Sequence, residues 1–276
     1  MSNSPWSHMR SAGIADDIDF EIKGQELQFV EIELDPGESA VAEAGAMVWK
    51  DASVGMTTVF GDGSGGSEGG FMGKLLGAGK RLVTGESLFT TVFTHQGSGK
   101  ARVAFAAPVP GAILPIKLDQ YGGTLICQKD AFLAAAKGVS IGIAFQKRIM
   151  TGLFGGEGFI MQKLDGDGWV FVQMGGTIVE RKLAPGEELH VDTGCLAAMT
   201  ADVDYDIMTV GGVKSALFGG EGMFLARLRG PGSVWIQSLP FARLAGRMLA
   251  ASGSRGGQSR GEGSLLGGLG NLIDGD

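Results

Sequence analysis

Three stretches of the chain repeat one pattern, and this repeat restricts the fold more than any other feature of the sequence. Each has a glycine-glutamate pair, an apolar run, a glycine-rich turn and a second apolar run, at residues 83–105, 154–173 and 218–237. Short apolar runs on either side of a glycine turn are typical of β-hairpins. The sequence therefore predicts three diverged copies of one β unit.

A second element repeats together with the hairpins. Residues 32–38 and 181–187 both end in Leu-x-Pro-Gly-Glu, and residues 116–123 form a looser relative with two glycines. Proline presets φ at the second position of a type II turn, and glycine supplies the positive φ that the third position requires. We expect a tight turn of this type between two strands of the first and of the third copy.

The composition agrees with an all-β chain of one large domain. The 276 residues are 44% apolar, and the 49 glycines follow no collagen-like period. We expect a pseudo-threefold β-barrel or prism with short peripheral helices. The expected organisation is a flexible N-terminus at 1–16, the three-repeat β domain at 17–240 with a Gly-rich insertion at about 61–82, a short amphipathic helix at 241–250, and a disordered Gly-rich tail at 251–276.

The repeated motifs resemble those of a known family. Phe-Gly-Gly-Glu-Gly occurs at 154–158 and 218–222, Thr-Gly-Glu-Ser-Leu-Phe at 84–89, and Gly-Ala-Met-Val at 45–48. Their order and spacing over about residues 17–240 resemble the AIM24 family. This resemblance implies a double-stranded β-helix fold like that of the tryptophan RNA-binding attenuator protein. It implies no established reaction and no agreed catalytic residues, and the mitochondrial member is linked to inner-membrane organisation.

Charge and sequence ends suggest where the protein works. The net charge is −7, which argues against a nucleic-acid surface, because such surfaces are usually basic. Residues 1–19 lack the apolar core of a signal peptide, and no run of about 20 apolar residues predicts a membrane span. Two cysteines far apart, Cys127 and Cys195, suggest free thiols. We expect a cytoplasmic protein.

The repeated glutamates Glu86, Glu157 and Glu221 are the most informative polar positions. Pseudo-threefold symmetry places them equivalently, and three converging carboxylates could bind a hard cation such as Ca²⁺ or raise one another's pKa. The alternative is that each glutamate accepts hydrogen bonds within its own glycine turn and recurs because the turn recurs. We favour the structural alternative and assign no metal site.

Other candidate motifs favour structural roles. The stretch at 165–168, Asp-Gly-Asp-Gly, resembles part of a calcium loop but lacks the further ligands, so it predicts a hairpin turn. His8, His95 and His190 form no metal-binding spacing. Cys127 and Cys195 lie in apolar contexts typical of buried thiols. We therefore assign no catalytic residue and no cofactor.

Two segments look helical and mix basic with apolar residues, at 71–83 and 239–251. In the second, Phe241, Leu244 and Met248 share one helical face, and Arg243 and Arg247 share a neighbouring face. Such a helix can lie on an anionic membrane or dock on a partner; the alternative is that it caps the β body.

These observations favour a non-enzymatic scaffold or interaction protein that self-associates or binds a protein partner, and that contacts a membrane peripherally. A small-ligand or RNA-binding module and a carboxylate-site metal-binding protein are the alternatives. The acidic charge makes nucleic acid the least favoured partner.

Overall fold

A computed structural model describes residues 14–60, 89–147, 159–209 and 224–252. The chain divides into two compact units, residues 1–243 and 244–276. We call the described part of the first the β unit.

The described strands fall into three repeats of six strands each. Repeat 1 follows an additional strand, β1 (Asp19–Lys23), and holds β2 (Phe29–Leu34), β3 (Ser39–Ala42), β4 (Met47–Lys50), β5 (Val54–Phe60), β6 (Phe89–His95) and β7 (Ala101–Ala106). Repeat 2 holds β8 (Gly111–Lys117), β9 (Thr124–Gln128), β10 (Phe132–Ala136), β11 (Ser140–Lys147), β12 (Phe159–Asp165) and β13 (Trp169–Gly175). Repeat 3 holds β14 (Ile178–Leu183), β15 (Glu188–Asp192), β16 (Leu196–Thr200), β17 (Asp204–Thr209), β18 (Phe224–Arg229) and β19 (Gly232–Gln237).

Pairing within each repeat is the same, and all of it is antiparallel. The first, sixth and third strands form one ribbon, as in β8-β13-β10, and the second, fifth and fourth form another, as in β9-β12-β11. Repeats 1 and 3 pair their strands in the same order. The prediction of a mostly β fold is therefore confirmed.

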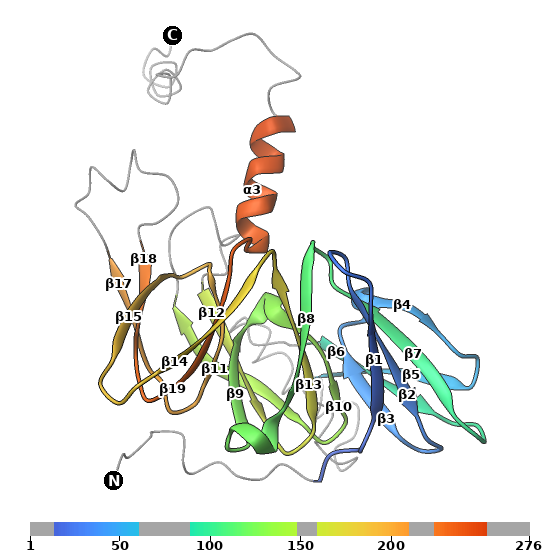
Figure 1. Cartoon of the computed structure of the whole chain (residues 1–276). Helices are drawn as coiled ribbons and strands as arrows, with labels where there is room; N and C mark the ends of the chain where they lie inside the picture. The colour runs from blue at the N-terminus through green and yellow to red at the C-terminus, as the bar shows by residue number, and fades with distance from the viewer. Residues whose placement is uncertain (1–13, 61–88, 148–158, 210–223, 253–276) are drawn as a thin grey trace, which may run out of the picture. The chain divides into compact units, whose positions relative to one another are not determined.

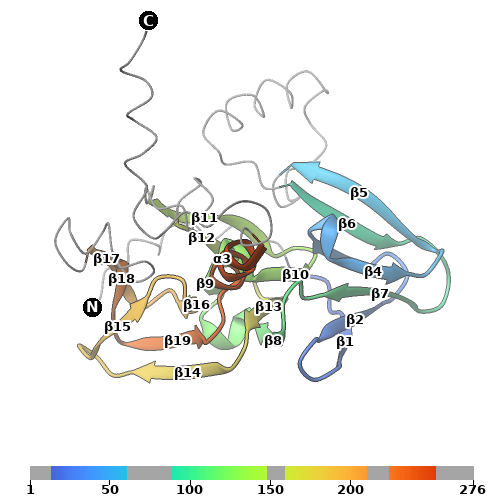
Figure 2. The same ribbon diagram turned by 90° about the horizontal axis from the view of Figure 1, so that it is seen from above.

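The ribbons of successive repeats merge into larger sheets. Sheet B (β5-β6-β3-β10-β13-β8) joins half of repeat 1 to half of repeat 2, and sheet C (β11-β12-β9-β16-β19-β14) joins repeats 2 and 3 in the same way. Sheet A (β1-β2-β7-β4) and sheet D (β15-β18-β17) are the halves left over. Sheets A and D lie at opposite ends of the β unit in both views (Figures 1 and 2).

Three apolar cores separate the four sheets. Core AB includes Ile32, Phe93, Phe105, Ala134 and Phe171. Core BC includes Val41, Leu125, Leu164, Val170 and Trp235. Core CD includes Ile126, Val191, Met199, Ile207 and Leu228. Because sheets B and C have a core on each face, their central strands are apolar on both faces, as in β10, where every residue is buried.

The two Pro-Gly turns have the predicted geometry. Gly37 and Gly186 have φ of 92° and 80°, the positive values that a type II turn needs at this position. The amide of the next glutamate donates to the carbonyl three residues back, at 3.0 Å in the first turn and 2.9 Å in the second. The glutamate carboxylate in turn accepts a hydrogen bond from the amide of the residue three positions back. Glu38 accepts from Asp35 at 2.8 Å, and Glu187 accepts from Ala184 at 2.9 Å.

The third, looser turn differs. Leu118–Tyr121 forms a short 3₁₀ helix there, and Gly122 ends it at a φ of 76°. A glycine at positive φ is thus the feature that all three turns share.

A 12-residue helix, α3 (Phe241–Ser252), follows the last strand where the sequence predicted a helix over 241–250. At 1.5 Å per residue it is about 18 Å long. Among the described residues, none of the helices has the length and hydropathy that crossing a membrane requires.

The turn geometry makes a testable prediction. Gly37→Ala places a side chain at a φ of 92° where no atom crowds it, so the cost is conformational and of about 1–2 kcal/mol in the free energy of unfolding. Gly45→Ala is the matched control, because Gly45 also has open space around it but no positive φ. Denaturant unfolding that gives equal stabilities for the two variants would contradict this account.

Candidate interaction surfaces

Among the described strands, two lack the inter-repeat partner that their counterparts in the other repeats have. Within the chain, the second strand of one repeat pairs with the third strand of the next, as β3 with β10 and β9 with β16. The third strand of repeat 1 is β4 and the second strand of repeat 3 is β15, and among the described strands each is an edge of its sheet. Figures 1 and 2 place these two edges at opposite ends of the β unit.

The β4 edge has the backbone geometry of its paired counterparts. Its register against β7 shifts between Met47 and Trp49, and β10 and β16 have the same shift at the equivalent position. The amide of Asp51 donates inward to Arg102 on β7 at 2.9 Å. Because successive amides of a strand point to opposite sides, the amide of Lys50 points to the open edge.

Apolar side chains are exposed along this edge. Val48 is 54% and Trp49 36% exposed, whereas their equivalents in repeat 2, Leu133 and Ala134, are 2% and 0% exposed. In repeat 3 the equivalents, Ala197 and Ala198, are also fully buried. The difference arises because β10 and β16 each have a preceding repeat beside them and β4 has none.

The β15 edge is more polar. Glu188 and His190 are exposed and contact each other, with the imidazole Nε2 2.8 Å from the carboxylate. The amide of Thr193 donates inward to Phe224, so alternation turns the amide of His190 toward the open edge. Val191 points to the other face, where it is buried in core CD.

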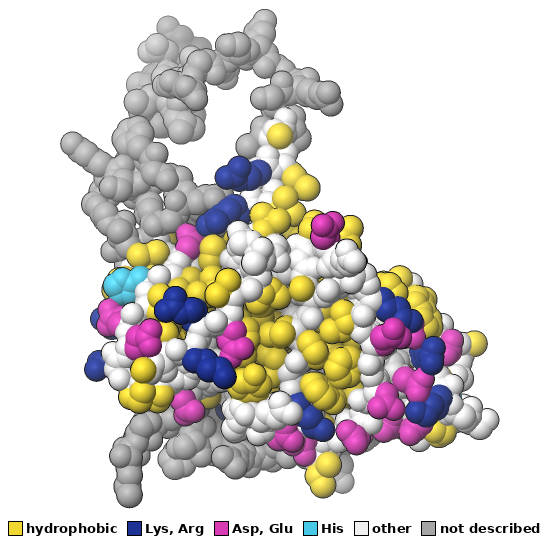
Figure 3. Space-filling model, viewed as in Figure 1, with side chains coloured by type: hydrophobic (Ala, Val, Ile, Leu, Met, Phe, Trp, Pro, Cys, Tyr) yellow, Lys and Arg dark blue, Asp and Glu magenta, His cyan; other side chains and the backbone are white. Residues whose placement is uncertain are grey.

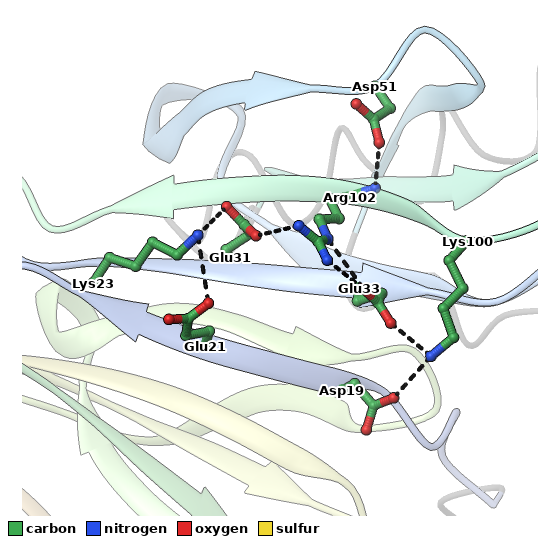
Figure 4. Close-up of polar contacts among 8 residues, drawn as sticks. All are labelled: Asp19, Glu21, Lys23, Glu31, Glu33, Asp51, Lys100 and Arg102. Carbon is green, nitrogen blue, oxygen red and sulfur yellow. Dashed lines mark hydrogen bonds and ion pairs between the residues drawn. The ribbon is translucent and has the colours of Figure 1, made fainter.

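The outer face of sheet A carries a network of ion pairs (Figure 4). Glu31 lies between Lys23 Nζ at 2.9 Å and Arg102 Nη1 at 3.2 Å. Glu33 lies between Arg102 Nη2 at 2.9 Å and Lys100 Nζ at 2.6 Å. Figure 3 shows acidic and basic side chains gathered at this end of the unit, while hydrophobic side chains cover the middle of the same face.

These cations offset a repulsion that the register imposes. Asp19 is directly opposite Glu33, and Glu21 is directly opposite Glu31, so two like-charged pairs face each other across β1 and β2. Lys100 contacts both members of the first pair and Lys23 both members of the second. Hydrogen bonds from Lys100 and Arg102 lower the pKa of Glu33 below its ordinary value of 4.5.

The glutamates singled out from the sequence, Glu86, Glu157 and Glu221, lie outside the described residues, and so does the basic-apolar segment at 71–83. Their neighbours locate the motif in the fold: it precedes β6, β12 and β18, the fifth strand of each repeat. The structural role that the sequence favours for these carboxylates stays a prediction.

The other candidate motifs have structural contacts. Asp165 accepts a hydrogen bond from Thr124 at 2.6 Å and pairs with Lys163 at 2.8 Å, while Asp167 accepts the Ala15 amide at 2.9 Å. These carboxylates therefore support the turn between β12 and β13. The predicted hairpin is wrong here, because β12 and β13 pair with other strands and lie in different sheets. Within the described ranges no group of three or more acidic, histidine or cysteine side chains is arranged to hold a metal ion.

The histidines and cysteines lie apart from one another. His95 is buried on β6 and bonds the Gly99 carbonyl at 3.0 Å, whereas His190 is exposed on β15; His8 lies outside the described residues. Burial raises the pKa of the Cys127 thiol to about 12. Burial together with the Asp192 charge raises that of Cys195. Raised pKa values keep both thiols protonated and poorly nucleophilic at neutral pH.

On α3 the predicted apolar face is exposed at both ends, with Phe241 48% and Met248 62% exposed. Arg247 is also exposed, and Leu244 is half-buried. Arg243, in contrast, contacts Asp192 of β15 at 3.5 Å. The two arginines therefore differ: the charge of Arg243 is engaged within the β unit, and Arg247 is the better candidate for an external contact.

The sequence reasoning missed both strand edges and the ion-pair network. A signal for the first was present: at aligned positions the chain has Val48 and Trp49 in repeat 1, but Leu133 and Ala134 in repeat 2 and two alanines in repeat 3. A bulky aromatic residue where the other copies have alanine indicates a different environment for that strand. The network could not be found, because it depends on the pairing of β2 with both β1 and β7.

Comparison with known proteins identifies the family. A family model described as mitochondrial biogenesis AIM24 matches residues 20–239. The chain belongs to the AIM24 family. This AIM24 protein is 33% identical over 230 residues to the uncharacterized protein M6_Spy0233 of Streptococcus pyogenes serotype M6, which covers 82% of this chain and 87% of that protein. It also resembles the crystal structure of protein SPYM3_0169 from Streptococcus pyogenes, with a TM-score of 0.66 and 27% identity over 85% of this chain and 99% of the other.

The ion-pair network predicts a pH dependence. The pKa of Glu33 is lowered in the folded state, so its contribution to stability is present above its unfolded pKa and is lost as the pH falls through the folded value. Glu33→Gln should therefore lower the thermal midpoint at pH 7, and this difference from the wild type should shrink as the pH falls below 4.5 towards about 3.

Thermal unfolding between these two pH values tests this expectation, with Glu26→Gln, an exposed carboxylate between β1 and β2, as the control. A difference between wild type and Glu33→Gln that does not change with pH would contradict the role assigned to the charge.

Proposed function

We propose that this AIM24 protein is a non-enzymatic scaffold that self-associates by extending its sheets and contacts an anionic membrane through its C-terminal helix. One observation carries the first part: apart from the additional strand β1, the two end sheets, A and D, correspond to the two halves of the six-stranded sheets inside the chain. A chain built in this way is a segment of a repeating structure that further copies can continue.

The inner and outer sheets differ in a way that supports assembly. At both inner joints every paired residue of the second and third strands is buried, as with Ala42 opposite Ala134 and Cys127 opposite Ala198. At the sheet A end of the β unit the same positions of β4 expose Val48 and Trp49. Exposed apolar residues next to an open strand edge are typical of interaction sites.

A closed prism or barrel of three repeats, expected from the sequence, belongs to this proposal. Strands from neighbouring copies would supply the partners that the open edges lack, so that closure is reached by the assembly. The non-enzymatic character is likewise part of the proposal. It is supported by the resemblance to the family, which implies no agreed catalytic residues.

Self-association is tested by sedimentation velocity of the full chain between about 1 and 100 μM. Each copy has a mass of 28.6 kDa. We expect species of two or more copies, and the fraction of the protein in these species should rise with total concentration. A single 28.6 kDa species over the whole range would overturn the scaffold.

The membrane contact rests on α3. Phe241 and Met248 are exposed on its apolar face, the exposed Arg247 lies beside them, and the helix contains no acidic residue. A helix of about 18 Å is too short to cross a hydrocarbon core of about 30 Å but can lie in the headgroup region. A basic side chain near an anionic surface contributes about 1 kcal/mol.

Flotation with vesicles of phosphatidylcholine and phosphatidylglycerol tests this contact. Arg247→Glu exchanges an attraction for a repulsion, so binding should weaken by about 2 kcal/mol, or about thirtyfold. Lys182→Glu, the same charge reversal at an exposed position of β14, is the control and should float like the wild type. Equal flotation of all three proteins, or none for the wild type, would overturn the membrane contact.

A further inference from the structure

We propose that β4 of one copy pairs, antiparallel, with β15 of a second copy, which joins sheet D of that copy to sheet A of the first. The inference rests on the self-association proposed above and names the partner, the two strands and their register. The partner is a second copy because each edge is the counterpart of a strand that the same chain already pairs.

The strongest evidence is that this joint is formed twice inside the chain in one register. At the first joint Ala42 is opposite Ala134 and Val41 is opposite Ala135. At the second, Cys127 is opposite Ala198 and Ile126 is opposite Met199, which are the equivalent positions. The three repeats contain three second strands and three third strands. The two internal joints use two of each, which leaves the second strand β15 and the third strand β4.

Repeat equivalence then sets the register between copies. Trp49 corresponds to Ala134 and Ala198, since all three pair with the same position of the sixth strand. Val191 corresponds to Ala42 and Cys127 by their pairing with the fifth strand. Trp49 is therefore opposite Val191, and Lys50 is opposite His190.

The backbone amides of both edges are oriented to form hydrogen bonds in this register. The amides of Lys50 and His190 point to their open edges, as derived above, so the two residues can exchange both backbone hydrogen bonds. The internal joint behaves in this way: the amide of Lys137 on the β10 side donates to the Ser39 carbonyl on the β3 side at 3.0 Å. The register shift in β4 is no obstacle, because β10 and β16 have it and are paired.

The side chains fit on both faces. Leu133 and Ala134 of repeat 2 complete core AB of the repeat before it, and Ala197 and Ala198 complete core BC. By the same relation, Val48 and Trp49 would complete core CD of the neighbouring copy beside Val191. An aromatic residue opposite a β-branched one is a favourable cross-strand pair.

The opposite face brings complementary charge. Lys50 would lie opposite His190, and Glu188, two residues along β15 on that face, contacts the same imidazole. Lysine on β4 and glutamate on β15 are therefore brought together across the joint. Polar groups occur here where the internal joints have Val41 and Ala135, which makes this a joint between separate molecules rather than a core of one.

Such a joint is heterologous, since each copy uses two different surfaces. Assembly is head to tail and gives a ring when the rotation between copies closes, or an open filament when it does not. Each copy has one β4 and one β15, so blocking either edge stops growth at that end.

Proline substitution tests the strands. Lys50→Pro and His190→Pro each remove an amide that points to the open edge and leave the ladder to β7 or β18 intact. Lys182→Pro is the matched control: Ser238 donates to Thr177, so by alternation the Lys182 amide also points outward, but from the β14 edge. Circular dichroism verifies that each variant is folded.

Sedimentation velocity then separates the outcomes. We expect at least tenfold weaker association for Lys50→Pro and His190→Pro and no change for Lys182→Pro. If the wild-type protein sediments only as a monomer, both this pairing and the proposed scaffold are overturned. A wild type that associates, with Lys50→Pro and His190→Pro associating equally well, would overturn the pairing alone and leave the scaffold in place.

Disulfide trapping tests the register even if a proline variant does not fold. Trp49→Cys and Val191→Cys are prepared as separate proteins, both with Cys195→Ser, and are mixed under oxidising conditions. Directly opposite residues of this kind have Cα atoms about 4.5 Å apart, within disulfide range. We expect linked dimers from this mixture and at least tenfold fewer from Trp49→Cys with Leu189→Cys; equal yields would overturn the register.

Discussion

The pairing of the second strand of one repeat with the third strand of the next is the interaction on which the rest of the structure depends. Without β3–β10 and β9–β16, each repeat would be two separate three-stranded ribbons around a single core. With them, sheets B and C each acquire a core on both faces. The chain gains buried surface from every joint, and the three diverged copies become one body.

This constraint explains which residues occupy the joints. Strands β10 and β16 are covered on both faces and at both edges, and every residue in them is buried. Their sequences, Phe-Leu-Ala-Ala-Ala and Leu-Ala-Ala-Met-Thr, are mostly small and apolar, because little volume remains between two cores. Trp49 at the equivalent place in β4 is much larger than these alanines, and it occurs where no neighbouring repeat is present in the chain.

Local features of the fold could be predicted from the sequence, and non-local ones could not. The Pro-Gly turns with Gly37 and Gly186 at positive φ and the position of α3 follow from turn chemistry and periodicity. The predicted hairpins at the glycine turns are wrong, because the strands on either side of each turn, such as β12 and β13, lie in different sheets. Strand order across repeats depends on contacts between residues about 90 apart, such as Ala42 and Ala134, which no local pattern encodes. The open edges and the ion pairs of sheet A follow from that order, so they were missed.

An open edge is also a hazard, because any extended strand can pair with it, and the two edges differ in how they limit this. The register shift at Met47 and Trp49 bends β4, so that it accepts a strand shaped to fit the shift, as β3 and β9 fit β10 and β16. On β15 the exposed Glu188 and His190 disfavour apolar strands, and Asp192 at its end contacts Arg243. Bulge and charge thus favour pairing with a second copy over indiscriminate association, and this selectivity is what a self-associating scaffold requires.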